Sequence, residues 1–357
     1  MKLKSLLLSA VVAAFIWGAA SPANSQTDLD LPLASQAAQV KQRLGVTDVT
    51  ITYHRPLVNG RKIWGALVPF GQVWRAGANE NTRVEFSTPV SVEGKPLPAG
   101  TYGLHMIPNP DAWTIIFSKM AVAWGSYSYN QTEDALRVEV KPRTLNEMED
   151  ALEYEFEDLK PDSVAVTLKW EKLAVPFRVS VNEPETVIAS IKNQLRGRAQ
   201  YSWNPLNEAA QYCLSKKTNL EESLKWADQS IQIEERFENL DTKADLLAAL
   251  NRADEAKKVR DHAMEIATPI QLYSHARQLQ AQKRSDAAMQ IFKTLVQRDP
   301  QTVFGHLAQA RIKSAAGDFD GALNEARAAQ AVAISDQQKQ SIKSLIDRLQ
   351  AKQDINK

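Results

Sequence analysis

The chain has 357 residues, which is long enough for two domains because single hydrophobic cores seldom grow beyond about 250–300 residues. Its 43 basic and 42 acidic residues give a net charge of +1, so no overall field favours nucleic acid or an anionic membrane surface as a partner. The single cysteine, Cys213, excludes an intramolecular disulfide. Its apolar neighbours favour a buried structural thiol over a reactive one.

The first 25 residues have the pattern of a secretory signal peptide. Lys2 and Lys4 precede the apolar run LLLSAVVAAFIW (6–17), and small residues follow at 18–25. The run is too short to favour a permanent transmembrane helix, although an uncleaved membrane anchor is the alternative. We therefore expect an exported protein, periplasmic or secreted, with no integral membrane span after cleavage.

Residues 35–181 have the pattern of a β-domain, in which short runs of alternating apolar and polar residues are separated by turn signals. Such spacing predicts eight to ten short strands in an antiparallel β-sandwich or jelly roll. Two segments, 36–44 and 145–150, instead favour helices. The expected strands are 49–54, 83–87, 90–92, 101–106, 114–117, 136–140, 152–156, 164–170 and 177–181.

Residues 185–357 form a second region with helical periodicity throughout. A repeat is visible where a small residue stands two positions after an acidic one, at Ser223, Ala256, Ala288 and Ala322, with intervals of 33, 32 and 34 residues. This period is typical of tetratricopeptide-type helical pairs, whose helices cross closely at small residues. The last helix, about 336–352, is polar enough to cap the array. Because most consensus aromatic positions are missing from the first two units, a generic array of helical hairpins is the alternative.

The stretch VWRAGANENTRVEFST (73–88) gathers polar side chains beside aromatic ones. Arg75 could anchor an anion, with Asn79 and Glu80 as hydrogen-bonding and acid–base groups. The structural alternative is a tight corner in which Asn79 adopts a left-handed turn and Glu80 pairs with Arg75.

Other candidate ligand-binding residues are His54 and Arg55 at the end of the first expected strand, His105 within 101–106, and Trp124. His54, His105 and Glu80 would complete a two-histidine, one-carboxylate metal site if the strands brought them together, but no HxH, HxxxH or HExxH spacing demands it. We therefore expect no metal and no cofactor. Trp124 begins the run WGSYSYN, which is typical of an exposed loop able to close over a pocket.

Five of the eight tryptophans fall in the β-domain, namely Trp64, Trp74, Trp113, Trp124 and Trp170. Core packing explains most of them, while an aromatic platform for a sugar or an apolar ligand is the alternative. The sequence contains no GxSxG elbow, Walker loop or dinucleotide fingerprint, so no known catalytic motif is present.

The order of motifs in the β-domain resembles the DUF2911 family of exported bacterial proteins. The matching stretches are ITYHRPLVNGRKIWGALVPFG (51–71), VWRAGANE (73–80), LPAGTYGL (97–104), WTIIF (113–117), WG (124–125), DALRV (134–138) and WEKLAVPF (170–177). The resemblance covers about residues 35–181 and implies a fold family and an exported location. It implies no reaction, because the family has no established one.

These patterns predict a binding protein rather than an enzyme, with a β-sandwich followed by a helical array that recruits a protein or peptide. The alternative is a small-ligand-binding or metal-dependent enzyme with its pocket near Arg75, Asn79, Glu80, His54 and His105.

Overall fold

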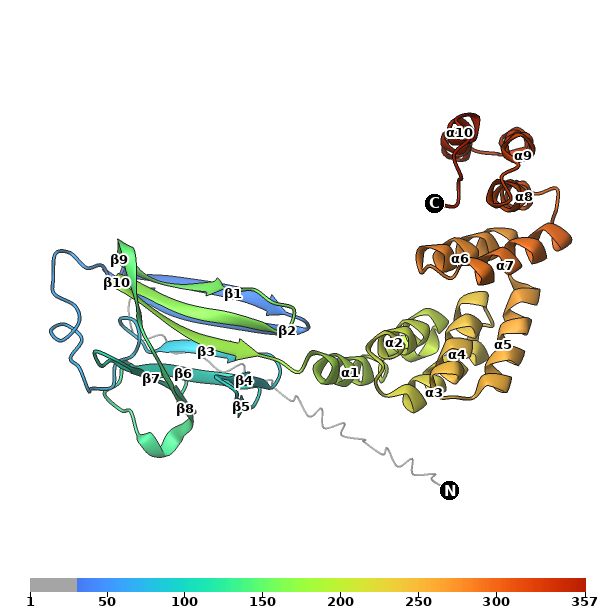
Figure 1. The fold of residues 1–357 in the computed structure, drawn as a ribbon. Coiled ribbons are helices and arrows are strands. Elements are labelled where there is room, and N and C mark those ends of the chain that lie inside the picture. Colours follow the sequence, from blue (N-terminus) through green and yellow to red (C-terminus); the bar gives the residue numbers. More distant parts are fainter. Residues whose placement is uncertain (1–30) are drawn as a thin grey trace, which may run out of the picture.

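The computed structural model describes residues 31–357, so the expected signal peptide (1–25) lies outside the described residues. Ten strands are followed by ten α-helices in this part of the chain (Figure 1). The fold is therefore an antiparallel β-domain followed by an all-α array, as the periodicities predict.

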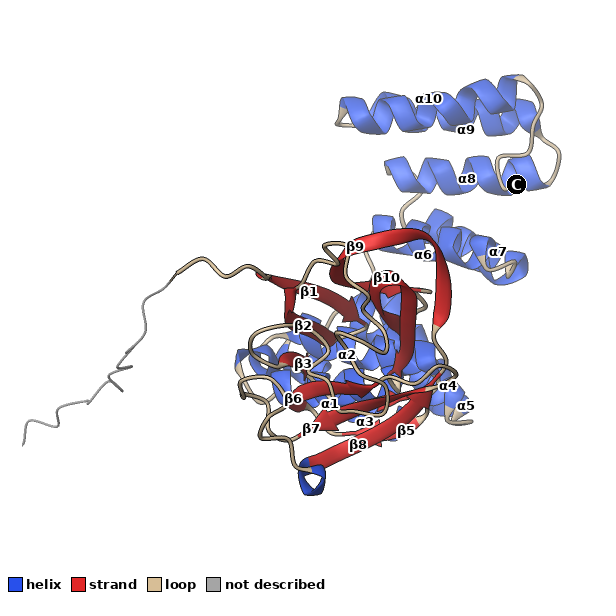
Figure 2. Cartoon of the chain, turned by 90° about the vertical axis from the view of Figure 1, so that its left-hand side faces the viewer, coloured by secondary structure: helices blue, strands red, loops and turns tan. Residues whose placement is uncertain are grey.

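The β-domain contains two antiparallel sheets with the strand orders β1-β2-β3-β6-β7-β8 and β5-β4-β10-β9. Alternate side chains of both sheets point into one apolar core, and this makes the domain a sandwich (Figures 1 and 2). The strands are β1 (Gln36–Leu44), β2 (Thr47–Arg55), β3 (Thr82–Phe86), β4 (Val90–Val92), β5 (Lys95–Leu97), β6 (Gly100–Ile107), β7 (Trp113–Ser118), β8 (Asp134–Val140), β9 (Arg143–Glu157) and β10 (Ser163–Ser180).

Both predictions of a helix in the β-domain are wrong. Residues 36–44 form β1, which pairs with β2 along its whole length, from Gln36 opposite Arg55 to Leu44 opposite Thr47. Residues 145–150 lie inside β9. Both segments contain good helix formers, but pairing with a neighbouring strand outweighs a propensity of a few tenths of a kcal/mol per residue.

The strands expected at 164–170 and 177–181 are one strand of 18 residues, β10. Its pairing with β9 shifts on either side of Glu171, which has a φ of +54°. A β-bulge allows a strand to bend and continue, so the irregular residues between the two runs do not end it.

The helices pair in the expected repeat, since α2 packs on α3, α4 on α5, α6 on α7 and α8 on α9. Their bounds are α1 (Glu183–Gln194), α2 (Trp203–Lys216), α3 (Leu220–Ile233), α4 (Phe237–Ala249), α5 (Ala253–Ile266), α6 (Pro269–Ala281), α7 (Ser285–Arg298), α8 (Val303–Ala315), α9 (Phe319–Val332) and α10 (Asp336–Gln350). The small residues of the repeat occupy the fourth position of the second helix in each pair and are buried. The array is therefore tetratricopeptide-like, with its small residues at the crossings.

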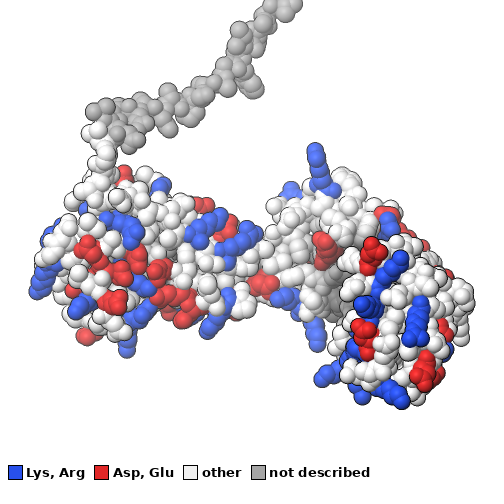
Figure 3. All heavy atoms as spheres, turned by 90° about the horizontal axis from the view of Figure 1, so that it is seen from above, with Lys and Arg blue, Asp and Glu red and all other residues white. Residues whose placement is uncertain are grey.

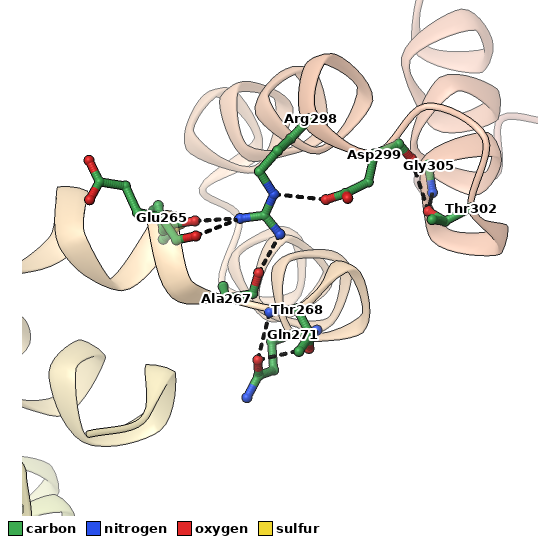
Figure 4. A network of polar contacts seen from close by, with 9 residues as sticks. Glu265, Ala267, Thr268, Gln271, Arg298, Asp299, Thr302 and Gly305 are labelled. Atoms are coloured by element: carbon green, nitrogen blue, oxygen red, sulfur yellow. Dashed lines mark hydrogen bonds and ion pairs between the residues drawn. The ribbon is translucent and has the colours of Figure 1, made fainter. Parts of the chain in front are cut away.

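Arg298 links consecutive pairs (Figure 4). From the end of α7 its guanidinium donates to the carbonyl oxygens of Met264 at 2.8 Å and Glu265 at 3.2 Å, in the last turn of α5, and to that of Ala267. Carbonyl groups in the last turn of a helix have no partner within the helix, so the arginine satisfies them. Nε of Arg298 also donates to Asp299, and this fixes the start of the turn that leads to α8.

Charges of both signs are interspersed on the face shown in Figure 3, in keeping with the balanced composition. Within residues 31–357 no helix is both long and apolar enough to span a bilayer.

Candidate functional site

A pocket of about 450 Å³ lies in the β-domain beside Arg75, and we call it the Arg75 pocket. Its walls come from the connection between β2 and β3, from the loop after β7 and from β10. The lining residues are Ser35, Pro56, Arg61, Leu67, Val68, Gln72, Val73, Trp74, Arg75, Gly77, Ala78, Ser126, Tyr127 and Trp170. Two of them are arginines and none is acidic, so the described walls carry positive charge only.

The connection between β2 and β3 is held in place on both sides of Arg75. Before it, Trp74 and Met106 of β6 exchange two backbone hydrogen bonds of 2.8 and 2.9 Å. After it, the carbonyl oxygen of Ala76 accepts hydrogen bonds of 2.9 Å from the hydroxyl groups of Thr82 and Tyr154. Ala76 has a φ of +51°, an uncommon value for a residue with a Cβ, and these hydrogen bonds compensate for the strain.

Asn81 fastens the second wall. Its side-chain Nδ2 donates to the carbonyl oxygen of Ala121 at 3.1 Å, and its Oδ1 accepts from the backbone N–H of Ala123 at 2.8 Å. A third bond of 3.0 Å runs from the backbone N–H of Asn81 to the carbonyl oxygen of Ala123. The loop that carries Ser126 is therefore pinned to the chain that carries Arg75.

Gly125 provides the space that the Arg75 guanidinium occupies. A Cβ at position 125 would lie 2.4 Å from Nη1 of Arg75, and its φ of +71° also favours glycine. Nε of Arg75 is buried and has no hydrogen-bond partner among the described residues. The expected Arg75–Glu80 pair does not form, because Glu80 lies beside His54, with 3.4 Å between Oε2 and Nδ1.

His105 contacts the pocket wall through Ser126. It is buried in β6, and its Nδ1 lies 2.8 Å from the hydroxyl oxygen of Ser126. Burial lowers the pKa of His105 to about 4, so the ring is neutral at physiological pH. A neutral imidazole can either donate to Ser126 or accept from it, and in both cases it fixes the position of the hydroxyl group.

Four tryptophans pack together beside the pocket. The rings of Trp74 and Trp170 stack at 5.9 Å with an interplanar angle of 16°, while Trp64 meets Trp113 edge-on at 4.9 Å. Trp113 and Trp170 are fully buried, so core packing accounts for both. Trp170 also borders the pocket, together with Trp74.

The remaining candidates lie outside the pocket. Asn79 has the expected left-handed backbone, with a φ of +57°, and its side chain donates to the carbonyl oxygen of Ser35 at 3.2 Å. Arg55 joins the two sheets, since it pairs with Glu153 at 3.1 Å and donates to the carbonyl oxygen of Leu152 at 2.9 Å. Trp124 is 59% exposed and does not line the pocket, although Ser126 and Tyr127 of its loop do.

The two-histidine arrangement is not formed, because His54 lies beside Glu80 whereas His105 contacts Ser126. Within residues 31–357, no three His, Cys, Asp or Glu side chains lie together as metal ligands.

A larger hollow of about 660 Å³ on the second sheet is less suited to a ligand. Its arginines already have carboxylate partners, Arg143 with Glu157 at 2.6 Å and Arg178 with Asp158 at 3.2 Å. The charges there are matched before any ligand arrives, in contrast to those of the Arg75 pocket.

The helical array contains a hollow of about 410 Å³, lined by the first helices of three consecutive pairs. We call it the open groove. Its residues are Gln211 and Leu214 of α2, Phe237, Glu238, Asp241, Thr242 and Asp245 of α4, and Gln271, Ser274, His275 and Gln278 of α6. Asp241 and Asp245 both pair with Arg260 of α5, and Glu238 accepts from Gln271 at 2.7 Å. Three carboxylates against one guanidinium leave the groove acidic.

Further along the same set of first helices, the chain binds its own segment Gln353–Lys357, which we call the tail. Arg311 of α8 donates to the carbonyl oxygen of Ile355 at 2.6 Å, and Gln280 of α6 donates to Asn356 at 2.8 Å. The Ile355 side chain is fully buried. This face therefore binds a non-helical segment through polar side chains and one apolar anchor.

Comparison with known proteins gives a family match for the β-domain. Residues 35–179 match DUF2911, described as a protein of unknown function. The match covers about two fifths of the chain, from just before β1 to the penultimate residue of β10, and confirms the resemblance drawn from the motifs. None of the curated proteins matches.

Solved structures that match include two tetratricopeptide repeat proteins. One is YrrB, described as a TPR protein with an unusual peptide-binding site, at 14% identity and a TM-score of 0.25, covering 46% of this chain and 84% of YrrB. The other is a tetratricopeptide repeat protein from Parabacteroides merdae, at 14% identity and a TM-score of 0.26, covering 48% of this chain and 69% of that one.

The sequence alone pointed to Arg75 and to the loop of Trp124. It did not point to Ser126, Trp170 or Arg61 as partners of Arg75. Ser126 and Trp170 come from distant parts of the chain, and only the order and register of the strands bring them to the pocket. Arg61 follows an Asn-Gly turn and has no local feature that separates it from a solvated surface residue.

Proposed function

We propose that this protein is an exported interaction protein whose helical array binds a basic, non-helical segment of a partner protein in the open groove. The observation that carries the proposal is the position of the tail. It is hydrogen-bonded to α6, α8 and α10, while the corresponding surface of α2, α4 and α6 forms the open groove. Helical arrays of this kind use such surfaces for peptides, which adds support by analogy of fold.

Charge complementarity supports a basic partner. Around the tail the array provides Arg311 and Arg348, and the tail provides Asp354, which accepts a hydrogen bond of 3.0 Å from Ser314. In the open groove the signs are reversed, since Glu238, Asp241 and Asp245 outnumber Arg260. An incoming segment with lysine or arginine would find the acceptors that the groove offers.

The test is selection from a displayed peptide library with the full chain, followed by measurement of Kd. We expect enrichment of lysine and arginine. Because a charge-assisted hydrogen bond contributes about 1.5–3 kcal/mol, the variant Glu238→Gln should bind a selected peptide at least about tenfold more weakly. Asp254→Asn, on the exposed side of α5, is the matched control and should bind normally. Selected peptides without basic residues, or equal affinity for Glu238→Gln, would contradict the proposal.

We also propose that residues 1–25 direct export and are then removed, on the evidence of their basic, apolar and small-residue pattern. Fractionation of the source cells followed by mass determination of the protein tests this. Export predicts a shortened protein outside the cytoplasm, and a full-length cytoplasmic protein would contradict it.

A further inference from the structure

The Arg75 pocket contains a cation without a counter-charge. Nε of Arg75 is buried without a hydrogen-bond partner, and none of the lining residues is acidic. A buried polar group left without a partner costs about 1–3 kcal/mol, and more when it is charged. The walls of the pocket therefore provide no carboxylate to balance the guanidinium charge, and an anionic ligand would provide one.

The Arg75 guanidinium packs closely against the loop after β7, at Gly125. A Cβ at position 125 would lie 2.4 Å from Nη1 of Arg75 and 3.3 Å from the Tyr127 ring, so the glycine leaves room for both side chains. Arg61 lines the same pocket from an exposed position and adds a second positive charge. The planar donors of a guanidinium suit a carboxylate, which it can bind through two hydrogen bonds.

Ser126 adds a hydroxyl group of defined position. If Nδ1 of His105 donates to the Ser126 oxygen, the hydroxyl proton is free to point into the pocket toward an anion. The neutral state of His105 makes this tautomer available without a second positive charge beside the pocket.

The rest of the lining is apolar and aromatic, with Leu67, Val68 and Val73 beside the stacked pair of Trp74 and Trp170. A volume of about 450 Å³ falls within the range of roughly 300–1,000 Å³ for small-molecule sites. The ligand therefore needs an apolar body as well as a negative charge.

We propose that the Arg75 pocket binds a small organic carboxylate, with its carboxylate on Arg75 and Ser126 and its apolar body against Trp74. This site is separate from the helical array, so the proposal does not depend on peptide binding in the open groove.

The experiment is titration of the full-length protein with 3-phenylpropionate and with hexanoate. Binding is measured by calorimetry and by tryptophan fluorescence, which reports on this pocket because Trp74 lines it. The uncharged 3-phenylpropionamide and inorganic phosphate are titrated in parallel. We expect saturable binding of at least one carboxylate and at least tenfold weaker binding of the amide and of phosphate. Equal binding of the amide, preference for phosphate, or no saturable binding of either carboxylate would overturn the proposal.

Variants locate the site. Arg75→Gln should lower the affinity for the bound carboxylate at least tenfold, while Arg83→Gln, on the exposed face of β3, should leave it unchanged. Ser126→Ala should lower it several-fold, with Ser128→Ala as the control in the same loop. The Ser126 pair provides the readout if Arg75→Gln does not fold. Unchanged affinity in both Ser126→Ala and a folded Arg75→Gln would place the ligand elsewhere and reject the site.

Discussion

The hydroxyl group of Tyr154 donates a hydrogen bond of 2.9 Å to the carbonyl oxygen of Ala76, across 78 residues of sequence. Tyr154 lies in β9 of the second sheet, whereas Ala76 follows Arg75 in the connection between β2 and β3 of the first. The bond therefore connects the wall of the Arg75 pocket to the opposite sheet, and the Tyr154 side chain that makes it is buried.

Removing this hydroxyl should destabilise the β-domain. Tyr154→Phe keeps the ring and its packing but leaves the Ala76 carbonyl with Thr82 as its remaining partner, so we expect a loss of about 1 kcal/mol in the free energy of unfolding. Urea unfolding measures it. Tyr201→Phe, at an exposed position, is the control and should change stability by less than about 0.5 kcal/mol. Equal stability of the two variants would show that the bond contributes nothing.

Glu157 should make the β-domain sensitive to acid. Burial alone would raise the pKa of Glu157, but hydrogen bonds from Thr167, Lys169 and Arg143 outweigh it and lower the pKa to about 2. A carboxyl whose pKa is lower in the folded state than in the unfolded chain contributes stability above its ordinary value of 4.5, and this contribution is lost as the pH falls from there toward 2.

Glu157→Gln tests this pH dependence. Because the carboxylate is partly solvated, we expect the variant to be less stable by roughly 1 kcal/mol at neutral pH. The difference should shrink as the pH falls from about 4.5 toward 2, because the carboxyl of the unfolded chain is protonated in this range before that of the folded protein. Urea unfolding across this range measures it, with Glu147→Gln, exposed in the same strand, as the control. A difference that stays constant with pH would contradict the assignment.

The small residues of the repeat should not tolerate enlargement. Ala322 is fully buried where α9 crosses α8, so Ala322→Leu should lower the free energy of unfolding by about 1–3 kcal/mol through overpacking. Ala331→Leu, exposed near the end of the same helix, adds the same atoms without this cost. Calorimetric melting of the two variants should separate them, and equal melting temperatures would mean that the crossing has spare room.

Cys213 should be unreactive in the native protein. It is fully buried, and its pKa is raised chiefly by burial, so the reactive thiolate is disfavoured twice. Iodoacetamide at about pH 8 should label the protein only after unfolding in urea. Rapid labelling of the folded protein would show that the helices around Cys213 open readily.

Periodicity was enough to predict both domains, because burial of one face leaves a repeat of two residues in strands and near 3.6 in helices. The acid–small repeat located α3, α5, α7 and α9 because close helix crossing restricts side-chain size at one fixed position. Propensity misled at residues 36–44, although Ala38, Val40 and Leu44 alternate toward the core as a strand requires.

The candidate site was harder to predict because side-chain direction depends on strand pairing. His54 and Arg55 are adjacent, yet successive residues of a strand point to opposite faces, so one lies beside Glu80 and the other reaches Glu153 in the second sheet. The structural alternative drawn from the sequence paired Arg75 with Glu80 because they lie five residues apart. The turn at Asn79 directs them apart, and this leaves Arg75 without an acid.

The connection between the two domains has only two residues, Val181 and Asn182, between β10 and α1. The loop between β2 and β3, which builds much of the Arg75 pocket, lies at the end of the sandwich remote from α1 (Figure 1). A carboxylate in the pocket and a peptide on the array would therefore fill separate volumes, and we expect both to bind at the same time without competition. Saturation with one ligand should leave the affinity for the other unchanged, because distant sites contribute additively to the free energy.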